Sequence, residues 1–397
     1  MWSVIHVLFV VLQVLIGYNL ALPLLLFVFY IFVPKKKYPL RPAGSAEPDY
    51  AVIVTAYQYT DSLPPVIESI LQLNYRNFLV YIVADNCDVT NLRFADERVV
   101  VLRPETILAS NTRSHFYAID RFRRAHDYLI IIDSDNLVDP ECLNELNRLF
   151  DAGFQAVQGL RQAKNLDTTF ACLDASRDLY YHFFDGEVLF RIGSSATLCG
   201  SGMAFSTKLY KDCLGHLDIT GAGFDKVLQM EILKRGLRIA FNEHAVVFDE
   251  KTTKSDQLVK QRARWINTWF RYFRFGFTLV GKGLIGFNFN QLVFGLILLR
   301  PPLFIFLLLS LGFLGVNLAL GAYFAAMLWT VGFVCFVLGF TISIIRAKPD
   351  KRIVRSLVNI PVFMFYQVIS LVKVRKANKI SVATQHYHSK GIDEIKK

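Results

Sequence analysis

The chain has 397 residues, which is enough for one catalytic domain and additional segments. Hydrophobic residues make up 53% of it and charged residues only 19%, against about 25% in an average soluble domain, so part of the apolar surface is expected to face lipid. The net charge of +11 does not indicate nucleic-acid binding, because no aromatic-basic module is visible and the basic clusters flank apolar stretches. The six cysteines form no C-x-x-C pair, which predicts neither a zinc site nor a disulfide framework and favours reduced thiols in a cytosolic domain.

Residues 1–34 contain no Asp, Glu, Lys or Arg and are predicted to form a transmembrane helix. A cleaved signal peptide is disfavoured, because such signals begin with a charged segment and have an apolar core of only about 7–15 residues. The basic cluster Lys35–Lys37 follows this stretch. Because basic residues are enriched on the cytosolic side of membrane helices, the cluster places the C-terminal end of the helix in the cytosol.

Residues 286–345 are predicted to form two transmembrane helices, one over about 290–314 and one over about 322–345. Arg300, which two prolines follow, leaves two alternatives for the first span. Either Arg300 lies in or near the membrane, where it must face protein or water, or it lies at the surface and the span begins at Pro301.

Two further stretches are typical of helices that lie on a membrane surface. Residues 265–285 mix Trp, Phe and Tyr with Arg and end a cytosolic domain over 48–275. Residues 353–373 are apolar but contain Arg, Asn, Pro and Gln, which favours an interfacial or re-entrant helix over a full span. Residues 374–397 are expected to form a basic tail in the cytosol.

Three short runs rich in β-branched residues are predicted to be strands of the middle domain: Tyr50–Ala56, Leu79–Ala84 and Leu129–Ile132. A helical pattern separates the first two. Strands that alternate with helices predict an α/β domain with a mostly parallel sheet. In such sheets, ligands bind beyond the carboxyl ends of the strands.

Three carboxylates follow these strand ends. Asp85 follows the second strand, and Asp133 and Asp135 follow the third. Asp133 and Asp135 are two residues apart, so they can point the same way and together hold Mg²⁺ or Mn²⁺ shared with substrate phosphates. Asp85 is a candidate to accept hydrogen bonds from a base or ribose. Alternatively, D-S-D-N is only a polar turn that closes a strand.

An ordered series of motifs resembles the membrane-embedded family 2 glycosyltransferases, the group of hyaluronan, chitin, cellulose and poly-N-acetylglucosamine synthases and of lipid glycosyltransferases. The similar motifs are V-T-A-Y (54–57), A-D-N-C-D (84–88), D-S-D (133–135), G-S-G-M-A-F (200–205), F-D-K-V-L-Q-M-E-I-L-K-R-G (224–236) and Q-R-A-R-W (261–265). They cover roughly residues 50–270. Their order and spacing, more than any single motif, carry the resemblance.

The resemblance implies a GT-A-like α/β fold for the cytosolic domain, a mostly parallel mixed sheet with helices on both faces, joined to a small helical transmembrane region. It also implies an inverting reaction, in which a sugar hydroxyl attacks the anomeric carbon of a UDP-sugar with the help of Mg²⁺ or Mn²⁺. The residues that it assigns are Ala56, Tyr57, Asp85 and Asp133 for the donor nucleotide, Asp133 and Asp135 for the metal, Gln261, Arg262 and Arg264 for the diphosphate, and Gly200, Ser201, Gly202, Met203 and Trp265 for the acceptor.

Asp225 is the predicted catalytic base, because the attacking hydroxyl needs a base within hydrogen-bond reach. Asp225 starts a helix that is expected to run to Gly236, and a helix N-terminus favours a negative charge. The leaving diphosphate needs charge neutralisation, which the metal and Arg264 would supply. Alternatively, Asp225 only caps its helix, and Arg264 and Trp265 are only an Arg-Trp pair at a membrane interface.

The chain also departs from the family's pattern. Phe224 stands where an acid usually precedes the base, and Gln58-Tyr59 stands where Asn-Glu is usual. A Gly-Lys-rich loop is replaced by A-S-N-T-R-S (109–114), in which Arg113 is the candidate to take the place of the lysine. Residues 380–388 lack the Trp of the gating segment in polymer synthases. These departures concern substrate identity and processivity more than reaction type.

We therefore expect a multi-pass enzyme of the cytoplasmic membrane that builds a β-linked polysaccharide from a UDP-sugar on the cytosolic side. The alternative in the same class is a single addition to a lipid acceptor. A non-catalytic receptor is disfavoured because Asp133, Asp135, Asp225 and Arg264 are all present, and a transporter because too few apolar segments surround the large soluble domain. The expected partners are the donor, the polysaccharide or lipid acceptor and membrane lipids, and no nucleic acid.

Overall fold

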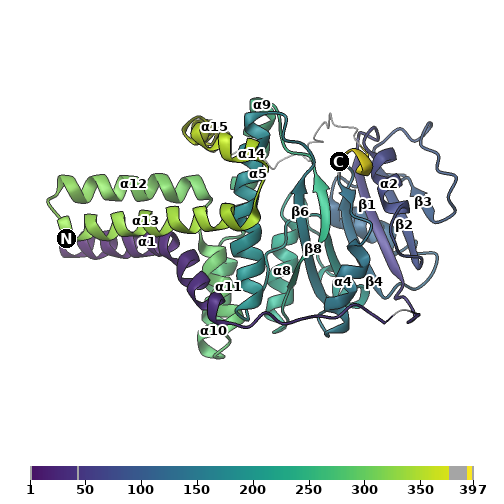
Figure 1. Ribbon diagram of the computed structural model, residues 1–397, viewed down its shortest axis with the longest axis horizontal. Helices are drawn as coiled ribbons and strands as arrows, with labels where there is room; N and C mark the ends of the chain where they lie inside the picture. The colour runs from purple at the N-terminus through teal and green to yellow at the C-terminus, as the bar shows by residue number, and fades with distance from the viewer. Residues whose placement is uncertain (1, 43, 375–390, 396–397) are drawn as a thin grey trace.

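The computed structural model describes residues 2–42, 44–374 and 391–395 (Figure 1). Figure 1 shows an α/β domain around one sheet and, at its opposite end, a group of long helices that project away from the sheet. The predicted basic tail, 374–397, lies almost wholly outside the described residues, and residues 380–388, which were compared with the gating segment of polymer synthases, lie entirely outside them.

The α/β domain is built on one eight-stranded sheet in the order β3-β2-β1-β4-β7-β6-β8-β5. The neighbouring strands β3, β2, β1 and β4 are parallel to one another, and β6 is parallel to β8. Strand β7 is antiparallel to its neighbours β4 and β6, and β5 is antiparallel to β8. The predicted mostly parallel mixed sheet is confirmed. The strands are β1 (Tyr50–Tyr57), β2 (Phe78–Asp85), β3 (Val99–Leu102), β4 (Tyr128–Asp133), β5 (Leu137–Val138), β6 (Ala156–Ala163), β7 (Met203–Ser206) and β8 (Ala240–Asp249).

The register of the parallel strands fixes the position of the site. Tyr57 at the end of β1 pairs with Asp85 at the end of β2, and Thr55 pairs with Asp133 at the end of β4. The strands β2 and β4 are almost entirely buried, and each ends at its first carboxylate, Asp85 or Asp133. The three strand ends therefore meet at one edge of the sheet.

Helices cover both faces of this sheet, as predicted. Alternate side chains of β1 separate into two cores, with Val52 and Val54 on one face and Ala51 and Ile53 on the other. The first core packs against α2 (Leu63–Leu71) and α4 (Cys142–Asp151). The second packs against α3 (Asn111–Ile119), α7 (Thr207–Leu214) and α8 (Phe224–Lys234).

A long helical segment joins the sheet to the projecting helices. It begins as α5 (Thr169–Tyr181), whose N-terminus is capped by the side chain of Thr168. It continues through π-helical turns at His182–Val188 and ends as α6 (Leu189–Arg191). Because π-helical turns occur often at functional sites, this segment is of interest for the cavity described below.

The stretch predicted as one helix over 265–285 is divided. Helix α9 (Ser255–Tyr272) ends before Phe273, and α10 (Phe275–Ile285) then forms a hairpin with α11 (Phe289–Leu299). A Cβ atom on Gly283 would lie 2.5 Å from the backbone nitrogen of Leu292, so a glycine is required where the two helices touch. The hairpin packs on α8, and Leu279 and Phe294 reach the second core.

Within the described residues, three helical stretches are long and apolar enough to cross a membrane. They are most of α1 (Trp2–Phe32), α13 (Tyr323–Ala347), and Lys351–Val372, which comprises α14 (Lys351–Ser356), a 3₁₀ turn and α15 (Ile360–Val372). Helices α1, α12 (Leu303–Ala319) and α13 contact one another as a bundle. Their outward side chains are largely exposed and apolar, as expected for a surface in lipid.

The stretch predicted as one span over about 290–314 contains a break between two helices. Helices α11 and α12 are bent by 74° at the break between them. Arg300 is extended there (φ −62°, ψ 120°), because a proline disfavours helical geometry in the residue before it and cannot donate a backbone hydrogen bond. Pro301 and Pro302 therefore end one helix and start the next.

Arg300 lies inside the protein, with only 8% of its surface exposed. Its guanidinium forms an ion pair with Asp185 of the π-helical turns. The arginine therefore faces protein and is not exposed to its surroundings. The pair fastens the bend between α11 and α12 to the segment that carries α5.

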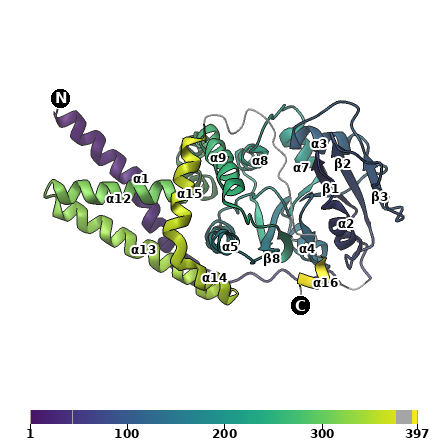
Figure 2. The ribbon, with the colours of Figure 1, turned by 90° about the horizontal axis from the view of Figure 1, so that it is seen from above.

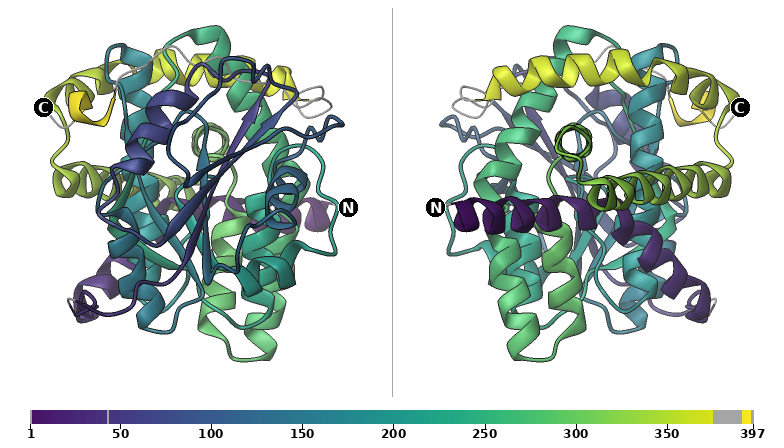
Figure 3. Two further views of the ribbon diagram at one scale, coloured as in Figure 1. Left: turned by 90° about the vertical axis from the view of Figure 1, so that its right-hand side faces the viewer. Right: turned by 90° about the vertical axis from the view of Figure 1, so that its left-hand side faces the viewer.

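Helix α15 crosses the base of the bundle instead of running along it. It packs against α9 and α5, and Figure 2 shows it between the bundle and the α/β domain. In Figure 3, α15 is seen lengthwise where α12 points toward the viewer. This placement is the one expected of an interfacial helix. The whole stretch Lys351–Val372, of which α15 is the last part, has 22 residues and is long and apolar enough for a span.

The Asp185–Arg300 pair gives a stability prediction. Asp185→Asn leaves a buried guanidinium without its counter-charge, so we expect a loss of about 3–5 kcal/mol. Arg346→Gln is the matched control, because it breaks the pair with Glu187, in which the arginine side chain is 41% exposed, and should cost at most about 1 kcal/mol. Thermal unfolding of the purified protein in detergent measures both. Equal losses in the two variants would contradict the structural role of the buried pair.

Candidate active site

A cavity of about 620 Å³ opens beyond the carboxyl ends of β1, β2 and β4. One end is lined by Thr55, Asp85 and Asp133 of the sheet edge. The other end reaches Arg300 and Phe304 at the bend between α11 and α12. Its volume is typical of ligand sites. The cavity thus extends from the sheet edge to the helices of the projecting bundle.

Ala56, Tyr57 and Asp85 line the cavity, where the nucleotide was predicted. Asp85 is buried and accepts hydrogen bonds from the backbone N–H groups of Leu108 (2.9 Å) and Ala109 (2.7 Å). Its carboxylate therefore holds the loop after β3 against the end of β2. This contact shapes the wall of the cavity beside any bound donor.

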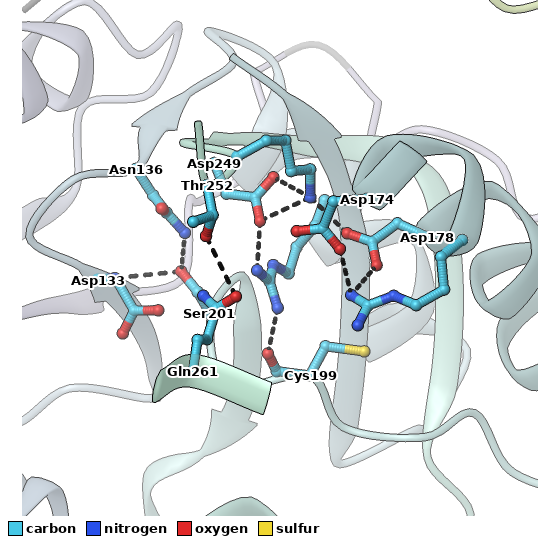
Figure 4. A network of polar contacts seen from close by, with 12 residues as sticks. Asp133, Asn136, Asp174, Asp178, Cys199, Ser201, Asp249, Thr252 and Gln261 are labelled. Atoms are coloured by element: carbon cyan, nitrogen blue, oxygen red, sulfur yellow. Dashed lines mark hydrogen bonds and ion pairs between the residues drawn. The ribbon is translucent and has the colours of Figure 1, made fainter. Parts of the chain in front are cut away.

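The D-S-D-N turn after β4 rests on one buried hydroxyl (Figure 4). Ser201 Oγ accepts hydrogen bonds from the backbone N–H of Asp133 (3.1 Å) and from Nδ2 of Asn136 (2.7 Å). Both Asp133 and Asp135 line the cavity. The turn is thus held from below by Ser201 while its two carboxylates border the cavity.

The residues predicted for the acceptor fall into two groups. Gly200 and Trp265 line the cavity. Ser201 is fully buried beneath the D-S-D-N turn, and the side chain of Met203 lies in the core on β7. Gly202 has φ +64°, and a Cβ there would lie 2.9 Å from the side chain of Val247. These three residues support the cavity wall and are not among its lining residues.

Asp225 lies in the first turn of α8 and lines the cavity. The N-cap of α8 is Gly223, with φ 105°, so the alternative that Asp225 only caps the helix is wrong. Lys226 Nζ lies 3.0 Å from the Asp225 carboxylate and donates to the carbonyl of Leu198 (2.9 Å). Burial lowers the pKa of Lys226, but the neighbouring groups Asp225, Cys199 and Asp185 together outweigh burial, so that the pKa is raised.

Phe224 precedes this carboxylate and is also among the residues that line the cavity. It is buried in the second core, and its ring packs edge-on against His115 with centroids 5.1 Å apart. Burial lowers the pKa of His115 to about 3, so the imidazole is neutral. The position where the family usually has an acid therefore faces apolar surroundings in this chain.

Helix α9 places Gln261 and Arg264 along the cavity. Gln261 accepts a hydrogen bond from Thr252 Oγ1 (3.2 Å). Burial lowers the pKa of Arg264, and the negative charge of Asp133 opposes this shift. Both residues line the cavity. Arg264 is thus positioned to neutralise charge that gathers beside Asp133.

Arg262 also lines the cavity, but its guanidinium is paired with another side chain. It is 3% exposed, and its guanidinium forms an ion pair with Asp174 of α5. The same group lies over the ring of Trp265, 4.1 Å from its centroid, and Arg177 lies over that ring at 4.5 Å. Arg262 therefore ties α9 to α5, and Arg264 is the better candidate for the diphosphate. Arg113 is outside the cavity lining and pairs with Asp218 at the surface (2.6 Å).

A network of buried ion pairs forms the floor between β8 and α5 (Figure 4). Asp249 pairs with Arg161 and with Lys251 (2.7 Å), and Lys251 also pairs with Asp178. The sequence analysis missed these residues. A signal was present, because Asp174, Asp178, Tyr181 and Asp185 recur at helical spacing along an otherwise apolar segment.

The sequence analysis also did not assign to the site the aromatic residues of α9 and of the turn after it. Trp269, Tyr272 and Phe273, which the sequence predicts only as part of a membrane-surface stretch, line the cavity. Trp269 stacks on Phe273 with ring centroids 5.0 Å apart. They give the cavity an apolar wall between Asp225 and the bend at Arg300.

A family model described as "Glycosyltransferase like family 2" matches residues 48–268, more than half of the chain. The chain belongs to this family. No curated protein matches it. The family domain thus ends within α9 and contains all of the residues assigned to the site.

One solved structure supports the fold of this glycosyltransferase. A mannosyltransferase from Pyrobaculum calidifontis, PcManGT, solved with GDP-Man and Mn²⁺, is similar over 93% of this chain and 98% of its own, with 15% identity and a TM-score of 0.58. TarS from S. aureus is similar over 58% of this chain and 40% of its own, with 16% identity and a TM-score of 0.39. The first likeness supports the GT-A-like α/β fold.

The donor set at the D-S-D turn fits a metal only in part. Among the described residues, no group of three or more His, Cys, Asp and Glu side chains could hold an ion. Asp133 and Asp135 offer two carboxylates at the cavity. Mg²⁺ commonly binds one or two carboxylates and takes its other ligands from water and substrate phosphates. The residues therefore fit a metal that binds together with a diphosphate.

Ser201 gives a prediction for the glycosyltransferase. Ser201→Ala removes the hydroxyl under the D-S-D-N turn, so we expect about a 10²-fold loss of activity, the order of magnitude for displaced catalytic groups. Ser206→Ala is the control, because that hydroxyl, at the other end of β7, caps α7 by accepting from the N–H of Leu209 (3.2 Å). The control should lose about 1 kcal/mol of stability and keep its activity. Initial rates and melting temperatures of both variants separate the effects. Wild-type rates for Ser201→Ala would exclude the supporting role.

Proposed function

We propose that this protein is an inverting, metal-dependent glycosyltransferase that uses a nucleoside diphosphate sugar at a membrane surface. The observation that carries the proposal is one cavity lined by Asp133, Asp135, Asp225 and Arg264. Membership of glycosyltransferase family 2 supports the same reaction class. The combination supplies a base for the acceptor and a positive group for the leaving diphosphate.

The reaction follows from the positions of these side chains. Asp225 accepts the proton of an acceptor hydroxyl, and the hydroxyl oxygen forms a bond to the anomeric carbon as the bond to the diphosphate breaks. Lys226 holds the Asp225 carboxylate at the cavity wall through its contacts with Asp225 and the Leu198 carbonyl. Arg264 offsets negative charge on the leaving diphosphate. Asp133 and Asp135 would hold Mg²⁺ or Mn²⁺, which would neutralise the same charge when bound.

The proposed donor is a UDP-sugar, on the resemblance to the polysaccharide synthases. The similar structure from P. calidifontis contains GDP-Man and Mn²⁺, so guanosine donors belong in the same screen. Asp85 and the loop that it holds, with Ala56 and Tyr57, form the part of the cavity assigned to the nucleotide. The hydrogen bonds of Asp85 to Leu108 and Ala109 suit a wall of fixed shape.

The far end of the cavity supports an acceptor that comes from the membrane. It is lined by Ile297, Pro301, Leu303 and Phe304 around the bend between α11 and α12. Beyond Phe304, large buried side chains fill the space between α1, α12 and α13: Leu20, Phe306 and Trp329. A packed bundle suits a lipid-linked acceptor presented at the cavity mouth, so we propose a single addition to such an acceptor over passage of a polysaccharide through the bundle.

We propose further that the protein lies in the cytoplasmic membrane with its catalytic domain in the cytosol. Helix α1 is followed at once by Lys35, Lys36 and Lys37, and α13 ends in Arg346, Ala347 and Lys348. Both basic clusters lie on the side of the α/β domain, as the excess of basic residues on cytosolic segments predicts.

The role of Asp225 is tested by Asp225→Asn. The variant keeps the shape of the site but cannot accept a proton, so transfer should fall by about 10²–10⁴-fold while donor binding persists. Asp212→Asn is the control, because Asp212 is an exposed residue of α7 outside the cavity lining and should not alter transfer. Nucleotide release and donor binding by calorimetry are measured on each. Unchanged transfer by Asp225→Asn would remove Asp225 as the base.

A donor screen tests the class of enzyme. Purified protein in nanodiscs is given Mg²⁺ or Mn²⁺, UDP- and GDP-sugars, and a membrane lipid extract as the source of acceptor. We expect nucleotide release with one donor, loss of that release with EDTA, and weaker donor binding in Asp135→Ala. Mass spectrometry should find lipids heavier by one sugar. A ladder of products would favour the polysaccharide synthase, and binding without turnover would favour a non-catalytic receptor.

A further inference from the structure

A second cavity, of about 410 Å³, lies where α1 enters the α/β domain. It shares no lining residue with the candidate active site. Its walls come from Val33–Tyr38 after α1, from Glu187 and Phe190–Gly193, from α4, and from residues Asn242–His244 of β8. A cavity of this size is large enough for a small ligand or headgroup.

The lining of this cavity is strongly basic. It contains three carboxylates, Glu145, Glu187 and Glu243, and each is in an ion pair with a basic residue. It contains six basic side chains: Lys35, Lys36, Lys37, Arg148, Arg191 and Arg238. The excess of positive charge favours the binding of an anionic ligand.

Two of the arginines are fixed by backbone carbonyls. Arg191 Nε donates to the carbonyl of Val33 (2.8 Å), and its guanidinium lies over the ring of Tyr30, 4.2 Å from the centroid. Arg238 donates to the carbonyls of Phe190 (2.5 Å) and Ser194 (2.7 Å). Carbonyl acceptors orient a guanidinium without neutralising its charge, so these groups keep their positive charge available for a bound anion.

The position of the cavity indicates the source of that anion. The last turns of α1, directly before Val33, carry exposed apolar side chains: Phe29 is 65% exposed, Ile31 57% and Phe32 79%. A free phosphate would contact only the basic residues of the cavity. A phospholipid would contact both the basic residues and the apolar side chains of α1, with its headgroup in the cavity and its acyl chains along the helix. Basic pockets at the cytosolic ends of membrane helices are typical sites for anionic headgroups.

The geometry points to a binding site for one anionic phospholipid, with its phosphate among Lys36, Lys37, Arg191 and Arg238. The bound headgroup would join the end of α1 to α6. The same π-helical segment that supplies Glu187 to this site presents His182 and Asp185 to the candidate active site. The lipid would therefore brace the element that separates the two cavities.

Native mass spectrometry of the full chain in detergent tests this site without turnover. Phosphatidylglycerol and phosphatidylcholine with the same acyl chains are titrated in turn. Wild type should retain one phosphatidylglycerol in preference to phosphatidylcholine. Lys36→Gln/Lys37→Gln should bind it about 30-fold more weakly, since each lysine near a headgroup contributes about 1 kcal/mol and 1.4 kcal/mol is tenfold.

The matched control is Lys208→Gln/Lys211→Gln, which removes the same charge from exposed positions on α7 outside both cavities. It should bind phosphatidylglycerol as wild type does. Excess inorganic phosphate is added in a separate titration and should not displace the lipid. Equal retention of both lipids by wild type, wild-type binding by Lys36→Gln/Lys37→Gln, or displacement by phosphate alone would each overturn the assignment.

Discussion

The arrangement of this protein depends on the pairing of buried charges between the sheet and the helices α5 and α9. Asp249 on β8 pairs with Arg161 on β6 and with Lys251, Lys251 reaches Asp178 on α5, and Asp174 pairs with Arg262 on α9. Breaking one buried pair leaves an uncompensated charge, at a cost of about 3–5 kcal/mol. The elements that surround the cavity are therefore held in one relative position.

This constraint has a consequence for catalysis. Helix α9 carries Arg262 toward α5 and Arg264 toward the D-S-D-N turn. Because the first arginine is fixed by Asp174, the helix is fixed in rotation, and the second arginine faces the strand end that bears Asp133. Catalytic groups act best when they are in place before the substrate arrives. The buried ion pairs thus fix the position of α9, just as the register of the sheet fixes the positions of Asp85 and Asp133.

The sequence predicts local features well and distant pairings poorly. The ends of β1, β2 and β4 were predictable because each is a buried run that stops at a carboxylate, and parallel register brings such ends together. The pairing of Arg262 with Asp174 joins residues 88 positions apart, and the sequence around each residue does not indicate which residue it pairs with. Ser201 and Met203 resembled an acceptor loop in sequence, but the pairing of β7 with β4 turns Met203 into the core. The bend after Arg300 was readable, because two prolines in succession rarely continue a helix.

The replacement of the usual acid by Phe224 also follows from buried charge. At that position the side chain enters a core that contains Leu228, Tyr210 and a neutral His115. A carboxylate there would have no basic partner in this core and would raise the free energy of the folded state. The chain instead pairs its one carboxylate at this helix end, Asp225, with Lys226. Aromatic side chains, among them Trp269 and Tyr272, make up part of the remaining cavity wall.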